Sequence, residues 1–222
     1  VTEILAIQDV EEIDVILFAL AGIDSQEDQT IVYETVTKII TKIDLEYNKL
    51  VVENDAYSTL LGLTQKEPGV LVISGTGSIA YAHNGDGKAT RAGGWGHRSG
   101  DDGSGYWIGR EILKAVYRME DGRNIPTLLK ELVFNYLNIS TIEELSKWNY
   151  GESYSVDKVA HLSHLLPLAL EKNDQIATAI FHRASCELVA LAQAVIKSAN
   201  IHNSPFGIYF NGGTICNFEE LY

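Results

Sequence analysis

The stretch Val70–Ala82 reads VLVISGTGSIAYA, two apolar runs separated by a short glycine-rich turn. Short runs of β-branched residues bounded by turn residues are typical of buried strands. Glycines at positions 75 and 77 permit a tight reversal of the chain, so we predict strands at 70–74 and 79–82 joined by a loop. The sequence Asn-Gly-Asp-Gly at 84–87 favours a second hairpin turn, which leads into a third strand at 88–92.

The segments before this hairpin predict a strand, a helix and a second strand. Residues 13–22 are almost continuously apolar and end in glycine, as expected of a buried strand in an α/β sheet. Residues 25–43 carry apolar side chains at helical spacing, and 50–52 form a short strand that ends near Asp55. A polar stretch with turn residues at 64–69 then interrupts the chain.

The second half of the sequence is mostly helical. We predict helices from near Asp102 to Met119 and from near Ile125 to Leu137. Thr141 followed by Glu144 is the signature of a capping box and predicts a third helix start. A long amphipathic helix of about 25 residues covers 176–195, and a last strand covers 207–210. This order of elements indicates an α/β fold with some antiparallel pairing.

The composition excludes several classes of function. The 222 residues carry 17 Lys and Arg against 30 Asp and Glu, a formal net charge of -13. Affinity for nucleic acid or an anionic membrane rests on clustered basic residues, so neither partner is expected. The two cysteines, Cys186 and Cys216, fit neither a disulfide framework nor a zinc site, and we interpret them as buried packing residues of a reduced, cytoplasmic protein.

Two short features could bind or activate a phosphorylated ligand. The glycines at 75 and 77 let the backbone approach a ligand, and Thr76 and Ser78 could donate to phosphate oxygens. An ordinary glycine-rich hairpin explains the same residues equally well. Asp55 follows a strand, where a carboxylate can act as a general base, but an aspartate there also suits a helix N-cap.

The most unusual segment is 93–105, which contains six glycines in the order GGWGHRSGDDGSG. Its backbone amides could line a cavity, Trp95 offers a flat apolar surface, and Asp101 could accept paired hydrogen bonds from a polyol. A helix beginning after Asp102 would point its positive end at the same ligand. The alternative is a surface loop without function, although long loops without function are uncommon. The glycine pair Gly212-Gly213 could contact a nucleotide or only allow a strand to meet a helix.

These segments, in this order, resemble the N-acetylglucosamine kinase branch of the BadF/BadG/BcrA/BcrD ATPase family. The match rests on Val72–Ser78, on Gly94–His97, on Gly100–Ile108 and, more loosely, on the glycine pair at 212–213. The resemblance implies an actin-like ATPase fold with two ribonuclease-H-like domains around a cleft. It assigns residues 1–67 to the first domain and 68–222 to the second, with both ends apparently truncated and a first phosphate loop missing.

The resemblance also implies a role for each matched residue. Asp55 is expected to be the catalytic base, and the helix through Ala177 to form a wall of the nucleotide site. The expected ATP-binding residues are Gly75, Thr76, Gly77, Gly212 and Gly213. The expected sugar-binding residues are Ser78, Ile79, Gly94, Trp95, Gly96 and Asp101.

The implied activity is ATP- and Mg²⁺-dependent phosphorylation of the 6-hydroxyl of N-acetylglucosamine or a related amino sugar, by a homodimer. No protein metal ligand is identified. One alternative is an ATPase that activates a 2-hydroxyacyl-CoA dehydratase or a benzoyl-CoA reductase through a shared iron–sulfur cluster. Another is a sugar sensor that keeps the fold but not the chemistry. Because the family's first phosphate loop is not found, we expect this chain by itself to be inactive.

Overall fold

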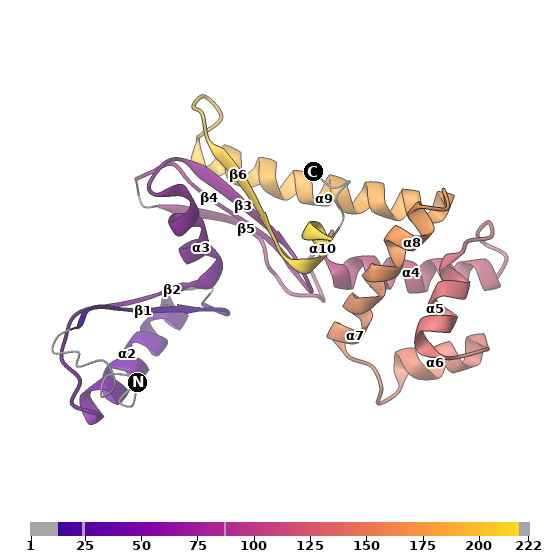
Figure 1. Ribbon diagram of the computed structural model, residues 1–222, viewed down its shortest axis with the longest axis horizontal. Coiled ribbons are helices and arrows are strands. Elements are labelled where there is room, and N and C mark those ends of the chain that lie inside the picture. The colour runs from indigo at the N-terminus through magenta and orange to yellow at the C-terminus, as the bar shows by residue number, and fades with distance from the viewer. Residues whose placement is uncertain (1–12, 24, 87, 218–222) are drawn as a thin grey trace. The chain divides into compact units, whose positions relative to one another are not determined.

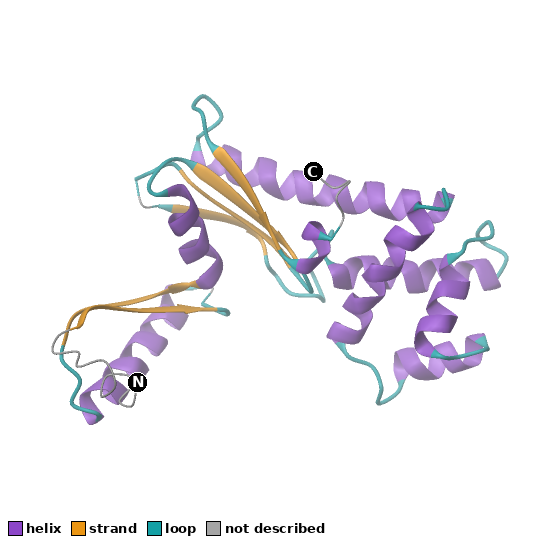
Figure 2. Ribbon diagram, viewed as in Figure 1, coloured by secondary structure: helices purple, strands orange, loops and turns teal. Residues whose placement is uncertain are grey.

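The computed structural model describes residues 13–217, except residues 24 and 87. The chain divides after Gln65 into two compact units. Figure 1 labels their helices and strands, and Figure 2 shows strands and helices in the first unit and a large helical part beside the sheet of the second.

The first unit is a parallel strand pair joined by a crossover helix. Its elements are β1 (Ile13–Leu20), α2 (Gln26–Lys42), β2 (Tyr47–Asn54) and α3 (Asp55–Thr64). The strands pair in parallel, with Ile16 opposite Leu50 and Phe18 opposite Val52. Ser25 caps α2 by accepting a hydrogen bond from the backbone N–H of Asp28. These elements confirm the predicted strand, helix, strand order.

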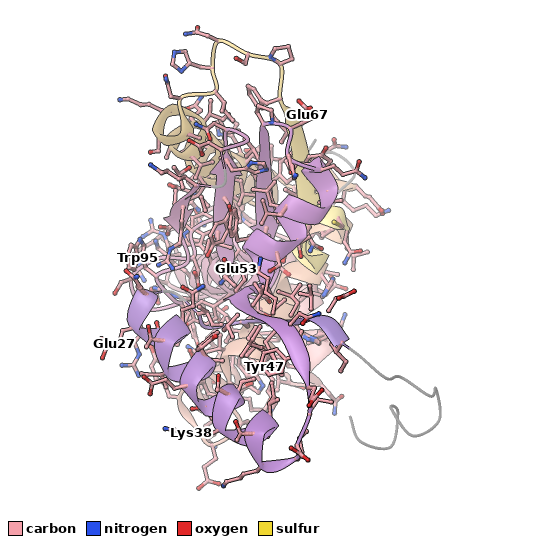
Figure 3. The ribbon with its side chains drawn as sticks, turned by 90° about the vertical axis from the view of Figure 1, so that its left-hand side faces the viewer. Glu27, Lys38, Tyr47, Glu53, Glu67 and Trp95 are labelled. Carbon is pink, nitrogen blue, oxygen red and sulfur yellow. The ribbon has the colours of Figure 1, made fainter. Side chains whose placement is uncertain are left out.

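The prediction that β1 is buried is wrong: five of its eight residues are exposed and the other three are only partly buried. Ile16 and Phe18 pack with α2 and β2, but Val15 and Leu17 are each 55% exposed. Successive side chains of a strand point to opposite faces, so a helix on one side covers only alternate residues. The exposed surface of α2 is mixed: it carries Glu27 and Lys38, labelled in Figure 3, but also Ile31 and Ile39, which are 56% and 54% exposed.

The second unit is built on a four-stranded sheet of order β5-β4-β3-β6. The central pair is antiparallel, β4 also pairs antiparallel with β5, and β3 pairs in parallel with β6. This confirms the predicted double hairpin. Helix α9 packs along β3, β4 and β5, so that Leu188, Val195 and Ala199 meet Val70 and Val72 in one core. The strands are β3 (Gly69–Ser74), β4 (Ser78–His83), β5 (Ala89–Gly93) and β6 (Gly207–Asn211).

A helical part with its own core completes this unit. Gly109 lets α4 pass so close to α7 that a Cβ at this position would overlap the carbonyl oxygen of Val159. Leu129, Leu145, Leu162 and Leu166 are fully buried at the centre of this part. Its helices are α4 (Gly105–Glu120), α5 (Leu129–Leu137), α6 (Ile142–Tyr150), α7 (Val156–His161), the 3-10 helix η1 (Leu162–Leu165), α8 (Leu166–Leu170), α9 (Gln175–Ala199) and α10 (Gly213–Cys216).

The helix boundaries confirm some predictions and correct others. The Thr141–Glu144 capping box forms as predicted, and α9 has the predicted 25 residues. Helix α4 begins at Gly105 instead of near Asp102, because Ser104 is the residue that caps it. Helix α5 begins at Leu129 instead of near Ile125.

Helix α9 joins the two parts of the unit and is its longest element. By length and composition alone it could cross a membrane, a criterion that buried core helices also meet. In the structure its buried residues contact both the helical core and the sheet. Ala177 is fully buried in the helical core. The expectation that the helix through Ala177 forms a wall of the nucleotide site stays a prediction.

Candidate functional site

The glycine loop between β3 and β4 is held by the first turn of α4. The backbone N–H of Gly105 donates to the carbonyl oxygen of Gly75 at 2.8 Å, and that of Tyr106 donates to the carbonyl oxygen of Thr76 at 3.2 Å. The first N–H groups of a helix have no partner within the helix and need one elsewhere. Here the loop carbonyls supply that partner, so the positive end of α4 anchors the loop. The sequence pattern predicts instead that this helix end points at a ligand.

This anchoring fixes the direction of the loop amides. In a trans peptide the N–H points opposite to the C=O of the same unit. With the carbonyls of Gly75 and Thr76 directed at α4, the N–H groups of Thr76 and Gly77 point away from it. Neither of these two groups donates a hydrogen bond to another residue that the structure describes. The loop therefore presents two adjacent donors on its outer side, the arrangement that favours an anion.

The second glycine pair lies beside this loop. A Cβ added to Gly75 would be 3.9 Å from both the Cα of Gly212 and the backbone nitrogen of Gly213. The hydroxyl of Thr214 donates to the carbonyl oxygen of Gly75 at 3.0 Å, which ties the start of α10 to the loop. Gly212 has a φ of 102°, and any side chain there would overlap the carbonyl of Ser74. The structure thus brings together segments separated by more than half of the chain.

Asp101 reaches the same loop from the 93–105 segment. Its carboxylate lies 2.9 Å from the position that a Cβ would take on Gly77. Burial raises the pKa of the Asp101 carboxyl, and hydrogen bonds from the backbone N–H groups of Ser78 and Gly96 partly oppose that shift. Asp101 also has a φ of 58°, a conformation that aspartate tolerates better than most residues.

The two serines at the ends of the loop hold the 101–104 segment. The hydroxyl of Ser74 donates to the carbonyl oxygen of Gly103 at 3.0 Å, and that of Ser78 donates to the carbonyl oxygen of Asp102 at 2.8 Å. Ser78 is only 3% exposed. Its proton is therefore used inside the protein, and only the lone pairs of its oxygen remain for another partner.

The Gly94–Gly96 segment begins at the end of β5. Gly94 lies directly against Ile79, where a Cβ would overlap the Ile79 side chain, and its N–H donates to the carbonyl oxygen of Ser78 at 2.9 Å. Trp95 is 72% exposed, and the guanidinium of Arg91 lies 4.6 Å from the centre of its ring. The structure thus brings Gly94 and Ile79 together and leaves Trp95 on the surface.

Asp55 is positioned by the first unit, as the first residue of α3. The N-cap of this helix is Asn54, whose side-chain oxygen accepts from the backbone N–H groups of Ala56 and Tyr57 at 2.9 and 3.1 Å. Asp55 is therefore not needed as the cap, which was the structural alternative for this residue. Its carboxylate is exposed and also accepts from the N–H of Ala56 at 2.8 Å.

The cysteines are not where the sequence suggested. Cys186 and Cys216 are both exposed, so their interpretation as buried packing residues is wrong. Cys186 lies mid-way along α9, on the side turned away from the core, because its neighbours Ala184 and Leu188 take the buried positions. Within the described residues, no three His, Cys, Asp or Glu side chains gather as they would around a metal ion.

Three residues that position the predicted site residues were not themselves predicted. Ser104 caps α4 by accepting from the backbone N–H of Trp107, and Asn54 caps α3. The hydroxyl of Thr214 ties the start of α10 to Gly75. Asn54 and Ser104 each stand immediately before a helix, which is a readable cap signal. Thr214 acts on Gly75, 139 residues away, and no local pattern could reveal that contact.

A comparison with known protein families shows to which family the chain belongs. The model of the BadF/BadG/BcrA/BcrD ATPase family matches residues 4–221. The chain belongs to this family.

Members of the family with a curated function are similar along almost the whole chain. The N-acetylmuramic acid/N-acetylglucosamine kinase of Clostridium acetobutylicum is 34% identical over 216 residues, which cover 97% of this chain and 69% of that one. The N-acetyl-D-glucosamine kinase of Dictyostelium discoideum is 34% identical over 223 residues, covering 97% and 68%.

Among solved structures, one from Chromobacterium violaceum, assigned as an N-acetylglucosamine kinase, superposes with a TM-score of 0.71 at 25% identity. It covers 92% of this chain and 67% of that one. The fold is therefore that of an actin-like ATPase.

Membership of an ATPase family implies that ATP is used, and the glycine loop suits its phosphates. The two outward N–H groups of Thr76 and Gly77 are donors without a partner among the described residues, and Gly75 and Gly212 keep the surroundings free of side chains. Asn173 adopts a φ of 56°, and Asp174 after it caps α9.

Proposed function

We propose that the protein transfers the γ-phosphoryl group of ATP to the 6-hydroxyl of N-acetylglucosamine or a closely related amino sugar. The observation that carries the proposal is the pair of free N–H groups of Thr76 and Gly77, turned outward by the anchoring of their loop on α4. Phosphoryl transfer needs donors that position and neutralise phosphate oxygens more than it needs covalent chemistry. The named kinase relatives support the amino sugar as the acceptor.

In this proposal the glycine segments hold ATP. Gly75, Thr76 and Gly77 contact the phosphates, and Gly212 and Gly213 border the adenosine, since they lie directly beside that loop. Mg²⁺ bound to the phosphates supplies further neutralisation of the charge that develops on their oxygens. No protein ligand for the ion is assigned within the described part of the chain.

The sugar is recognised from the 93–105 segment. Asp101 accepts hydrogen bonds from two sugar hydroxyls, while Gly94, Gly96, Ile79 and the oxygen of Ser78 border the ring. Trp95, which is 72% exposed, covers the ring or its acetamido group once the sugar is bound. Asp55 acts as the base that removes the proton of the attacking hydroxyl. The exposed and otherwise unneeded position of its carboxylate supports that role.

The test is an assay of ADP release by the full-length protein with ATP and Mg²⁺. N-acetylglucosamine, N-acetylmuramic acid, glucosamine and glucose are offered in parallel. We expect release with one or both N-acetylated sugars, at least tenfold above glucose. Release that does not depend on any sugar would contradict the proposal and favour the activator ATPase, whose iron–sulfur cluster would be visible by its absorbance.

The raised pKa of Asp101 predicts a pH dependence of sugar binding. A carboxylate accepts two hydroxyls only above its pKa, and burial moves that pKa upward. As the pH falls, the KM for the sugar should therefore rise at a higher pH than an ordinary aspartate would require. The KM for ATP should stay flat over the same range. Asp101→Asn should raise the KM for the sugar at every pH and abolish its further rise at low pH. If the KM of this variant still rose as the pH falls, the titrating group would be a residue other than Asp101.

A further inference from the structure

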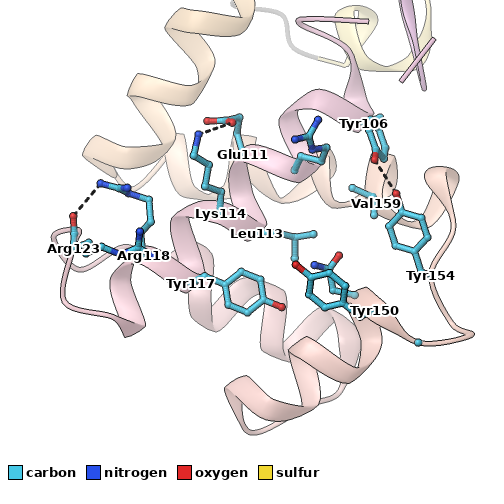
Figure 4. Close-up of a pocket in the computed structure, with 13 residues that line it drawn as sticks. Tyr106, Glu111, Leu113, Lys114, Tyr117, Arg118, Arg123, Tyr150, Tyr154 and Val159 are labelled. Atoms are coloured by element: carbon cyan, nitrogen blue, oxygen red, sulfur yellow. Dashed lines mark hydrogen bonds and ion pairs between the residues drawn. The ribbon is translucent and has the colours of Figure 1, made fainter. Parts of the chain in front are cut away.

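A second concave site lies in the helical part of the second unit. It is a cavity of about 750 Å³ between α4 and the segment that links α6 to α7. Figure 4 shows Tyr106, Leu113 and Tyr117 of α4 on one wall, with Tyr150 and Tyr154 facing them. None of the residues proposed above to bind ATP or the sugar lines it.

The cavity is basic, although the protein as a whole is acidic. The whole chain has a net charge of -13, yet the lining contains four cations and one carboxylate. Positions 106, 110, 113, 114 and 117 are spaced three or four residues apart, so α4 presents them on one face. The charged lining residues are Arg110, Lys114, Arg118, Arg123 and Glu111.

Two of these four cations have no carboxylate partner among the described residues. Glu111 is shared between Lys114 at 3.3 Å and Arg183 at 2.6 Å, the latter reaching over from α9. Arg123 pairs with Asp121. Neither Arg110 nor Arg118 forms an ion pair with any carboxylate that the structure describes. Arg110 instead lies near the ring of Tyr106, 5.9 Å from its centre.

The tyrosines add donors and flat surfaces. The buried hydroxyl of Tyr117 makes no hydrogen bond of normal geometry to a described residue, although Asn149 and Ser146 lie near enough to influence its pKa. This hydroxyl is buried away from solvent, so Tyr117 contributes its ring to the cavity wall. Tyr106 and Tyr154 close one end through a hydrogen bond of 2.8 Å between their hydroxyls, and Tyr150 at the rim is 83% exposed.

These features define the class of ligand. The volume suits a small molecule. Arginine side chains bind phosphate through paired charged hydrogen bonds, and tyrosine rings pack on the flat face of a sugar or base. We propose that this cavity binds a small phosphorylated molecule with a sugar ring, as a site separate from the proposed catalytic one. A sugar phosphate and a nucleotide share this chemistry.

The experiment measures binding by isothermal titration of the full-length protein, without turnover. The probes are N-acetylglucosamine 6-phosphate, AMP and inorganic phosphate. We expect one of the first two to bind at least tenfold more tightly than inorganic phosphate, and the tighter of them identifies the source. The double variant Arg110→Gln/Arg118→Gln should weaken that binding by about tenfold or more, since it removes two charged donors.

Three further variants distinguish binding in this cavity from binding elsewhere on the protein. Lys38→Gln removes the same kind of charge from the exposed surface of α2 and should change nothing. Asp101→Asn lies in the proposed sugar site, so it should weaken only the binding of N-acetylglucosamine 6-phosphate at that site and leave unchanged the binding that the arginine double variant weakens. Tyr150→Ala should weaken binding without unfolding the protein, because its ring is mostly exposed. The proposal is overturned if no probe binds, or if the arginine double variant binds every probe as tightly as the unaltered protein does.

Discussion

Replacing Asp55 with asparagine is expected to lower kcat about a thousandfold and to leave the affinity for the sugar within about twofold. Asparagine keeps the shape and a hydrogen-bonding oxygen but cannot accept the proton of the attacking hydroxyl. The helix that carries Asp55 should be unaffected, because Asn54 supplies its cap. Steady-state ADP release and direct titration of the sugar, made on the same preparation, separate the two effects.

Two controls make this result interpretable. Glu34→Gln removes a carboxylate from the exposed surface of α2 in the same unit and should leave kcat unchanged. Asn54→Ala removes the cap and should cost about 1 kcal/mol of stability. If Asp55→Asn lowered the melting temperature as Asn54→Ala does and kept its kcat, Asp55 would be a structural residue and the assignment as base would fail.

Replacing Gly109 with alanine should destabilise the second unit by about 3 kcal/mol or more, the upper range of overpacking effects. Within an exposed helix the same change gains about 1 kcal/mol, because alanine is the better helix former. At Gly109 the new Cβ would overlap the backbone carbonyl of Val159, and backbone in a packed helix cannot move aside as a side chain can. Thermal unfolding should show a melting temperature lower by about 5–10 °C.

The chain contains a matched control for this prediction. Gly62 also lies inside a helix, α3, but a Cβ there would have nothing within 4 Å. Gly62→Ala should therefore stabilise the first unit by about 0.5–1 kcal/mol. Equal effects of the two substitutions would show that α4 and α7 do not approach each other as closely as described.

Local signals account for what could be predicted of the fold. The Asn84-Gly85 turn and the Thr141 capping box act within a few residues, and the structure confirms both. The start of α4 depended on choosing between Asp102 and Ser104 as the cap, and the Ser104 side chain, which accepts from the backbone N–H of Trp107, decides it. Val15 is exposed because no helix in the part of the chain that the structure describes covers its face of the strand. A continuous apolar run does not indicate which face will be covered, since that depends on tertiary packing.

The candidate site was predictable where function imposes an unusual composition. The glycines at 75, 77, 94 and 212 were recognisable because glycine is rarely clustered at strand ends unless a tight turn or a close approach of the backbone requires it. What they contact was not predictable: the sequence gives no sign that the carbonyls of Gly75 and Thr76 bind the first turn of α4. The basic cavity was missed for the same reason, since its lining is spread from Tyr106 to Val159 and only the folded chain assembles it.

The backbone of the 93–105 segment has a consequence for how this sequence can change over time. Gly93, Gly94, Gly96, Asp101 and Gly103 all have positive φ, a region that most side chains enter only at a cost of about 1 kcal/mol or more. Most single substitutions at these five positions would thus be strained before any ligand is considered. Homologues are expected to vary freely on the exposed sides of α2 and α9. The 93–105 segment should vary slowly even in homologues that have lost the activity, because its backbone conformation restricts the residues that fit.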